Sequence, residues 1–589
     1  MKKTYLAILL LSFVACQTKE TNSRMINLNK LLDNYYEERL QYFPMEATAI
    51  ADNRYNDTLP ADISDSYREK LKGFYKKYID EISNVDTASL TKQERLSYDV
   101  FKREMSIQLE GLNFRDNLMP INQFWGMHLS FALLGSGSGN QPFKTVKDYD
   151  DFLKRISDFS AWVDTAIANL KTGIIEGYVQ PKVLMERVLP QLKEIVVTDP
   201  EKSVFYGPIK NIPETFSQQD KSRLTASYKS AIMNEVVASY SRLHDFIKNE
   251  YMPHCRSKVG ITEVPHGKEY YNYLARVWTT TDLTPDAIFE IGQSEVARLR
   301  GAMEGIMKET GFKGNLKEFF HFIHTDKKFF PFQADSEVIN MFRSYEGKMQ
   351  PKLSEYFNLV PKAKFEVRQT EKFREASASA EYNQSAPDGS RPGIFYVPVI
   401  DPKKYNVVGM EDLFLHEAIP GHHYQTSIQQ ENDSLPKFRR FGWFGAYGEG
   451  WALYTESLGK ELGLYTDPYQ YFGSLSEEMH RAIRLVVDVG MHLKGWTREK
   501  AIQFSLDNEM ESEADITAEV ERYIAIPAQA LAYKIGQMKI IELRKRAEQK
   551  LGDKFSLKSF HDEVLEDGCL PLDIFEKKMD RWMNDQTKK

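Results

Sequence analysis

The chain has 589 residues, of which 42% are hydrophobic, 27% charged and 12% aromatic, and this globular composition excludes a long disordered or low-complexity protein. Its 77 basic residues against 84 acidic ones give a net charge of −7, so no basic excess can neutralise phosphates and we expect no nucleic-acid partner. Three cysteines exclude a disulfide framework.

The N-terminus has the features of a bacterial lipoprotein signal. A positive start, Met1-Lys2-Lys3, precedes an apolar run from Leu6 to Val14 that is too short to span a bilayer, which needs about 20 residues. The run ends Phe13-Val14-Ala15-Cys16, which resembles a lipobox with Cys16 as the lipidated residue. We expect a signal over 1–15, a polar tether over 16–24 and a mature protein outside the cytoplasm, anchored by lipid at the periplasmic side or the cell surface. The alternative is plain secretion with an incidental cysteine.

Most of the remaining chain has apolar residues at helical spacing, which predicts a mainly α fold. The clearest helices are Leu28–Tyr42, Ser66–Ile82, Lys92–Leu112, Tyr149–Gly173 and Tyr228–Tyr251. Thr284-Pro285-Asp286 places a proline at a first helical position, before a helix over 288–309. A loose boundary near 250 separates an N-terminal helical region, 25–250, from a C-terminal region, 251–589, although the two could form one continuous domain.

Two short segments are the best candidates for strands. Gly393–Ile400 is rich in aromatic and β-branched residues, and Lys364–Gln369 alternates apolar and polar residues and could pair with it. The sequence therefore predicts a small β-sheet within the helical body. Cys255 and Cys569 would lie in an oxidising compartment, and the sequence leaves open whether they pair.

Three of the twelve histidines lie within eight residues, in His416-Glu417-Ala418-Ile419-Pro420-Gly421-His422-His423. His-Glu on a helix is similar to the zinc-peptidase motif His-Glu-x-x-His, in which both histidines bind the metal and the glutamate is the general base. Here position 420 is Pro, and in an unbroken helix His423 would lie about 10 Å along the axis from His416. A zinc site therefore requires the helix to break, which Pro420-Gly421 favours. We favour His422 as the second ligand and leave His423 as its alternative or as a neighbour.

A third ligand is expected from the helix that contains Glu449 and Glu456. The segment Tyr447–Glu456 is otherwise apolar, and a carboxylate on such a face needs a metal or a cation. We favour Glu449 as the ligand and Glu456 as the second choice or as a residue that supports a ligand.

Two further segments carry candidate catalytic side chains. Arg484, Asp488 and His492 recur every four residues and share one helix stripe, which could orient a metal-binding histidine or stabilise an oxyanion; the alternative is a solvent-facing salt-bridge ladder. Tyr533 follows a helix-starting Pro527 and could donate to a substrate carbonyl, or pack structurally.

Taken together, these segments resemble the bacterial domain-of-unknown-function family 885, which includes many predicted lipoproteins. The segments that match its pattern in order are 416–423, 449–454, 487–492 and 527–536, with Ala528 where many relatives carry Gly. The family is similar to gluzincin-type metallopeptidases of mainly helical build with a deep cleft. That resemblance implies zinc at His416, His422 and Glu449, with Glu417 as the base.

Three functions follow from these patterns. The first is a zinc metallopeptidase that cleaves short peptides, in which Glu417 takes a proton from water and passes it to the leaving amine, and the strand Gly393–Ile400 pairs with an extended substrate as an edge strand does. The second is a zinc hydrolase of another amide or an ester. The third is a lipoprotein that binds a ligand without catalysis, although a pure binding site has no need of Glu417.

Overall fold

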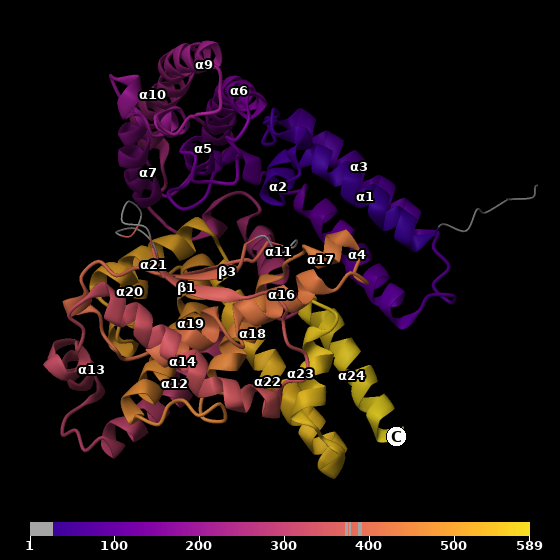
Figure 1. Ribbon diagram of the computed structural model, residues 1–589, viewed down its shortest axis with the longest axis vertical. Coiled ribbons are helices and arrows are strands. Elements are labelled where there is room, and N and C mark those ends of the chain that lie inside the picture. The colour runs from indigo at the N-terminus through magenta and orange to yellow at the C-terminus, as the bar shows by residue number, and fades with distance from the viewer. Residues whose placement is uncertain (1–26, 371–374, 376–378, 387–390, 589) are drawn as a thin grey trace, which may run out of the picture.

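The structure, a computed structural model, describes residues 27–370, 375, 379–386 and 391–588. The expected signal over 1–15 and the lipidation site Cys16 lie outside the described residues. The chain is mainly helical with one small sheet, which confirms the predicted fold class (Figure 1). None of the helices in the described part of the chain is long and apolar enough to cross a membrane.

The first part of the chain forms ten helices. These are α1 (Leu28–Tyr42), α2 (Pro44–Ala49), α3 (Asp65–Ser83), α4 (Lys92–Gly111), α5 (Met127–Gly135), α6 (Val146–Glu176), α7 (Lys182–Ile195), α8 (Gly207–Lys210), α9 (Gln218–Ala231) and α10 (Ala238–Phe246). Figure 1 shows α5, α6, α7, α9 and α10 gathered in a lobe at the top, with α1, α3 and α4 running beside it. The predicted helices over 28–42, 66–82, 92–112 and 149–173 correspond to α1, α3, α4 and α6.

In the rest of the described chain, four α-helices lie between α10 and the sheet, and ten follow the sheet. The first four are α11 (Gly267–Thr279), α12 (Pro285–Glu309), α13 (Leu316–Thr325) and α14 (Asp335–Tyr356). The others are α15 (Met410–Glu417), α16 (His422–Glu431), α17 (Lys437–Arg440), α18 (Gly445–Glu456), α19 (Pro468–His492), α20 (Arg498–Asn508), α21 (Glu513–Ala525), α22 (Ala532–Leu551), α23 (Leu557–Leu565) and α24 (Leu572–Lys588). As the sequence predicts, Pro285 opens α12, and the Thr284 side chain accepts a hydrogen bond from the Ala287 amide.

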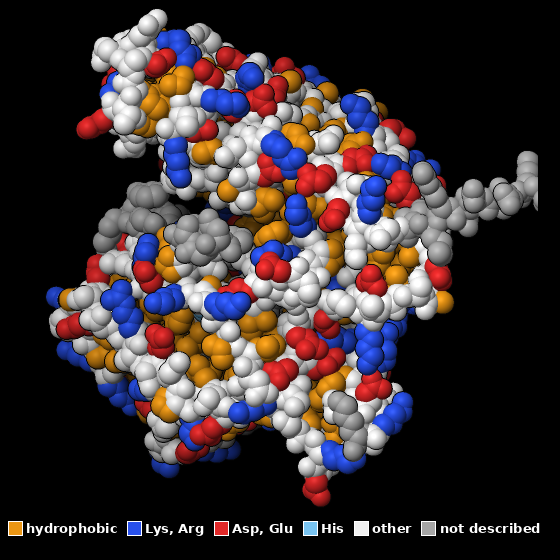
Figure 2. Space-filling view, turned by 45° about the vertical axis from the view of Figure 1, so that its right-hand side comes forward, with side chains coloured by type: hydrophobic (Ala, Val, Ile, Leu, Met, Phe, Trp, Pro, Cys, Tyr) orange, Lys and Arg blue, Asp and Glu red, His pale blue; other side chains and the backbone are white. Residues whose placement is uncertain are grey.

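Burial of apolar side chains joins these helices. One buried cluster extends from Leu59 to Met583 and so includes side chains from both halves of the chain. A second cluster lies between α1, α3 and α4. On the surface in Figure 2, acidic and basic side chains are intermingled rather than gathered in a patch of one sign. Cys255 and Cys569 are free thiols, so they do not pair in this structure.

The sheet has three strands in the order β1-β3-β2. β1 (Phe365–Gln369) is parallel to β3 (Gly393–Val397), and β2 (Glu381–Asn383) is antiparallel to β3. The predicted pairing of the two longer segments is confirmed. The prediction that the strand from Gly393 is an edge strand is wrong, because β3 is bonded to β1 on one side and to β2 on the other. β1 and β2 are the outer strands of the described sheet.

Candidate metal centre

The helix that carries His416 and Glu417 ends directly after them. α15 stops at Glu417, the Ile419–Pro420 peptide bond is cis, and α16 begins at His422. A Cβ atom on Gly421 would lie 2.0 Å from the His416 carbonyl oxygen, so only glycine lets the chain turn back so closely on α15. The break places the rings of His416 and His422 4.7 Å apart, centroid to centroid, and nearly perpendicular at 88°.

α18 holds this break in place. The Trp451 indole donates a 2.8 Å hydrogen bond to the carbonyl of Pro420, and the Thr455 hydroxyl donates one of 3.1 Å to the carbonyl of Leu415. α18 is itself fixed against α22, where a Cβ atom on Gly450 would lie 2.5 Å from the backbone of Gly536. Trp451 and Thr455 were not predicted from the sequence to have these roles, although both lie in the apolar segment that contains Glu449 and Glu456.

His416, His422 and Glu449 present three possible ligand atoms that all lie within 4.8 Å of one another. The Glu449 Oε2 atom is 3.6 Å from His416 Nε2 and 3.5 Å from His422 Nε2. Ligand atoms about 2.0–2.1 Å from one tetrahedral zinc ion lie roughly 3.3 Å from each other, so this spacing fits a zinc ion. The three residues come from the end of α15, the start of α16 and the middle of α18.

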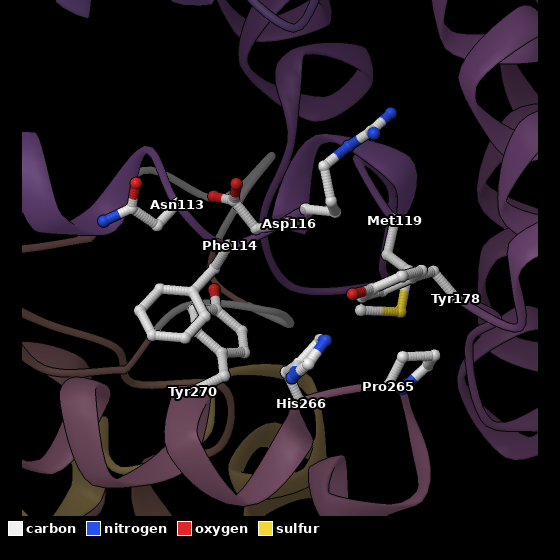
Figure 3. A pocket seen from close by; sticks show the side chains of 9 residues that line it. Asn113, Phe114, Asp116, Met119, Tyr178, Pro265, His266 and Tyr270 are labelled. Carbon is white, nitrogen blue, oxygen red and sulfur yellow. The ribbon is translucent and has the colours of Figure 1, made fainter.

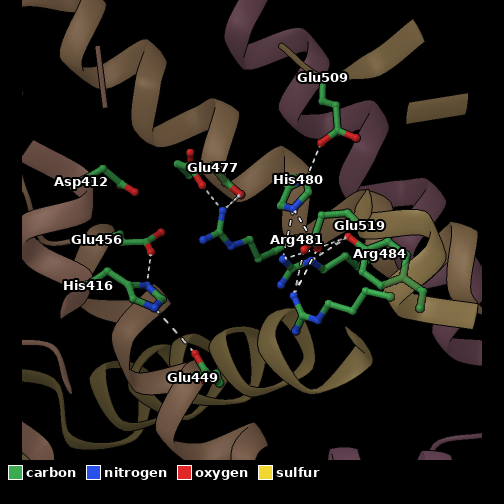
Figure 4. A network of polar contacts seen from close by, with 12 residues as sticks. Asp412, His416, Glu449, Glu456, Glu477, His480, Arg481, Arg484, Glu509 and Glu519 are labelled. Atoms are coloured by element: carbon green, nitrogen blue, oxygen red, sulfur yellow. Dashed lines mark hydrogen bonds and ion pairs between the residues drawn. The ribbon is translucent and has the colours of Figure 1, made fainter. Parts of the chain in front are cut away.

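Glu456 supports the first of these ligands. Its Oε1 atom lies 2.6 Å from His416 Nδ1, on the opposite side of the ring from Glu449 (Figure 4). A carboxylate on Nδ1 fixes the ring orientation and leaves Nε2 available to a metal, as in the histidine zinc sites of other proteins. Glu456 therefore lies behind a candidate ligand and outside the group of three donors.

The carboxylates of this site favour positive charge at its centre. Burial alone would lower the pKa of His416, but its hydrogen bonds to Glu449 and Glu456 raise it well above its usual value. Burial would likewise raise the pKa of Glu449, but the His422 and His416 rings lower it. A divalent cation supplies this positive charge without a bound proton.

Glu417 lies beside this group and is almost fully buried, at 8% exposure. Burial raises its pKa above 4.5, although the His416 and His422 rings oppose the shift. A carboxylate whose pKa is raised holds a proton more readily, which suits a group that accepts a proton and returns it.

His423 points away from the three donor atoms. Its ring packs against Phe365 of β1, with centroids 5.0 Å apart, and its Nδ1 atom lies 2.9 Å from the hydroxyl of Tyr382 on β2. Burial lowers the pKa of His423 to about 4, which keeps the ring neutral. Of the two neighbouring histidines, the structure brings only His422 to the group.

The stripe of Arg484, Asp488 and His492 lies on α19, but each residue has partners away from the metal-binding group. Asp488 accepts hydrogen bonds from the Tyr271 hydroxyl and the Ala528 amide, and Ala528 has φ +67°, a conformation that favours glycine. His492 accepts from the Ile261 amide at Nδ1 and faces the Tyr523 carbonyl with Nε2, 3.0 Å away. Asp488 and His492 thus make contacts that hold other elements of the fold, away from the three grouped donors. Because Arg484, Asp488 and His492 are all buried, the alternative of a solvent-facing salt-bridge ladder is wrong.

His492 is expected to make the protein less stable in acid. Burial lowers its folded pKa to about 4 from a usual 6.5, so the unfolded chain binds the extra proton first as the pH falls. Between pH 7 and pH 4 this removes about 3 kcal/mol from the free energy of unfolding. The asparagine in His492→Asn can still accept a hydrogen bond from the Ile261 amide, but it does not titrate. In urea unfolding at pH 7 and pH 4, this variant should lose less free energy of unfolding than the wild type, by about that amount. An equal loss in both proteins would contradict this assignment.

Tyr533 and Arg484 belong to a polar network at the far side of α19. The Arg484 guanidinium lies 4.6 Å from the centre of the Tyr533 ring, and the Arg522 Nη2 atom donates to the Tyr533 hydroxyl at 3.4 Å. Figure 4 shows Arg481, one turn before Arg484, between this network and Glu456. Arg484 was a candidate from the sequence and Arg481 was not; the sequence signal for Arg481 is its place in the same Arg-Ala-Ile-Arg run.

Two pockets in the described part of the chain differ strongly in size. One of about 320 Å³ lies next to the candidate metal centre and is lined by Tyr382, Gln384, His422, Thr426 and Trp443. The other, of only about 20 Å³, lies between the segment after α4 and the start of α11 (Figure 3). The second has room for roughly one water molecule, so only the first is large enough to admit a substrate.

One other set of acidic side chains lies close together in the described chain. Glu563, Glu566 and Asp567 meet within metal-binding distance of one another, but they surround the Lys578 ammonium group, which is 2.8 Å from Asp567. A lysine already supplies the positive charge there, so this group has no need of a cation.

Comparisons with known proteins place the chain among uncharacterised relatives. Residues 44–579 match the model of a family described as "Bacterial protein of unknown function (DUF885)". A protein from Colwellia psychrerythraea, described as a predicted lipoprotein, has a similar solved structure, with a TM-score of 0.86, 26% identity, and coverage of 95% of this chain and 99% of that one. Another, from Shewanella oneidensis and described as a predicted lipoprotein of unknown function, has a TM-score of 0.74, 18% identity, and coverage of 94% and 99%. No curated protein matches the chain.

Proposed function

The chain belongs to this bacterial family of unknown function, and we propose that it is a zinc-dependent metallopeptidase that hydrolyses short peptides outside the cytoplasm. The observation that carries the proposal is the break after α15, which gathers His416, His422 and Glu449 and leaves Glu417 buried beside them. Two imidazoles, one carboxylate and an adjacent glutamate are the side chains of a hydrolytic zinc site.

Each residue of the site has a role in this proposal. His416, His422 and Glu449 would hold the metal, and a zinc ion there would polarise a carbonyl and lower the pKa of water toward about 7. Glu417 takes a proton from the attacking water and delivers it to the leaving amine, a transfer that its raised pKa favours. Glu456 holds His416 in the orientation that this arrangement requires.

The pocket beside His422 supports a small substrate. Its volume of about 320 Å³ is near the lower end of the range of roughly 300–1,000 Å³ for small-molecule sites, which suits a short peptide better than a folded protein. Tyr382 lines the pocket from β2, which is an outer strand of the described sheet, so an extended peptide in the pocket would lie beside a strand.

We also propose that the protein is anchored to a bacterial membrane through a lipid on Cys16. The lipobox-like sequence at Phe13-Val14-Ala15-Cys16 supports this, and so do the descriptions of the two similar structures as lipoproteins.

A peptide-mixture assay tests the proposed activity. The purified protein should cleave peptides in a mixture of short peptides of different sequences. It should lose this activity after treatment with a zinc chelator and regain it when zinc is added back. Mass spectrometry of the products would reveal the cleaved bonds. Cleavage that resists the chelator, or zinc-loaded protein that cleaves no peptide, would contradict the proposal.

A further inference from the structure

Two arginines on α19, Arg481 and Arg484, have buried N–H groups without hydrogen-bond partners in the described chain, and Arg481 lies near the candidate metal centre. Arg481 bonds through Nη1 to Glu477, and Arg484 bonds through Nε to Tyr523 and through Nη2 to Glu519. Within the described chain, Arg481 Nε and Arg484 Nη1 have no hydrogen-bond partner although both atoms are buried. A buried donor of a charged group that stays unpaired is costly, so such donors indicate a ligand.

The two side chains lie on the side of the network that faces the metal-binding group. Residues 481 and 484 are one helical turn apart on α19, and in Figure 4 both guanidinium groups extend toward the side where His416 and Glu456 are drawn. Arg481 is close enough for its charge to lower the pKa values of both Glu417 and Glu456. A ligand that reaches both the metal-binding group and Arg481 therefore has only a short distance to span.

The surroundings of the arginines fit an anionic group carried by a peptide. Arg522 of α21 and Tyr533 of α22 border Arg484, and the Phe124 ring lies 5.3 Å from the Arg522 guanidinium. Phe124 is 49% exposed, so the network borders the protein surface at Arg522, whereas the Arg484 side chain is only 6% exposed. The guanidinium fork matches the two oxygens of a carboxylate.

We propose that Arg481 and Arg484 form a carboxylate-binding subsite of the same active site, which makes the preferred substrates peptides with a carboxylate near the scissile bond. The inference rests on the proposed peptidase function for the class of ligand. The carboxylate is either the C-terminus of the peptide or an acidic side chain, and both present the same two oxygens to the arginines.

Binding of matched peptides separates these sources. Four N-acetylated tripeptides serve as probes: Ala-Ala-Phe with a free C-terminus, the same peptide as an amide, and Ala-Glu-Phe and Ala-Gln-Phe as amides. Titration calorimetry on full-length Glu417→Gln protein measures affinity without cleavage. At least one carboxylate peptide should bind about tenfold or more tightly than its neutral counterpart, as expected for a charge-assisted bidentate contact.

Arginine variants in the same background identify the subsite. Arg481→Gln and Arg484→Gln should each remove the preference for the carboxylate. Arg498→Gln should keep it, because Arg498 pairs with Glu521 of α21 and not with a partner of Arg481 or Arg484. If Arg484→Gln unfolds at a clearly lower temperature than the wild type, Arg484→Lys is used in its place. Lysine keeps the positive charge but lacks the two-pronged guanidinium group, so this variant should also lose the preference for the carboxylate peptide.

The outcomes are distinct from those that test the proposed function. Equal binding of the acid and neutral peptides, no binding of any of the four, or a preference that survives both arginine variants would overturn the subsite. Binding with the expected preference by a zinc-loaded wild-type protein that cleaves none of the peptides would support the subsite and contradict the peptidase activity.

Discussion

Replacing Glu417 with Gln is expected to lower the rate of peptide hydrolysis by a factor of about 10²–10⁴ while the protein keeps its zinc. Glutamine has nearly the same shape, so the packing at the end of α15 is retained, but it cannot take a proton from water. Glu417 is not one of the three grouped donors, so the metal content should stay at that of the wild type. Steady-state kinetics on a cleaved peptide and metal analysis of the same samples provide the two measurements.

Glu346→Gln is a suitable control for this variant. Glu346 is exposed on α14, so its loss removes the same charge from the chain without touching the site. A Glu417→Gln protein as active as this control would eliminate Glu417 as the base, and one that had lost its zinc would show that Glu417 supports the metal instead.

Substituting His422 with Ala is expected to remove zinc from the purified protein and, with it, all hydrolysis that the chelator abolishes. The change deletes one of three donors, and a carboxylate and a single imidazole hold zinc poorly. Elemental analysis after dialysis should find about one zinc per chain in the wild type and almost none in the variant.

The neighbouring histidine provides a closely matched control. His423→Gln changes the adjacent residue, whose ring faces Phe365 and Tyr382 rather than Glu449, so this protein should retain its zinc. Retention of zinc by His422→Ala together with its loss from His423→Gln would contradict the ligand assignment.

Much of the fold could be predicted from local patterns. The spacing of apolar residues is a property of each helix alone, which is why α1, α3 and α4 match their predicted ranges closely. The position of β3 within its sheet was not a local property. Its second neighbour, β2, has only three residues, too few for a recognisable pattern, and so β3 was mistaken for an edge strand.

The candidate site could be predicted only in part, because some of its features are local in sequence and others depend on contacts between distant segments. Pro420 and Gly421 indicate a break between His416 and His422, but the direction of the turn depends on the close approach of Gly421 to the His416 carbonyl and on Trp451 of α18. Neither contact is visible in the sequence.

The stripe on α19 shows the limit of such reasoning. Arg484, Asp488 and His492 do share a helix, yet their roles depend on partners from elsewhere in the chain. Asp488 holds the Ala528 amide, and His492 joins Ile261 to Tyr523. Spacing along one helix cannot reveal which other elements pack against it.

The most direct test of the account is X-ray diffraction from crystals of the full-length protein, recorded on both sides of the zinc absorption edge. The account predicts a single anomalous peak bound by His416 Nε2, His422 Nε2 and the Glu449 carboxylate, with Glu456 on His416 Nδ1. Diffraction that placed the zinc at His423 or among Glu563, Glu566 and Asp567, or that found none between His416, His422 and Glu449 in protein crystallised with zinc, would contradict it.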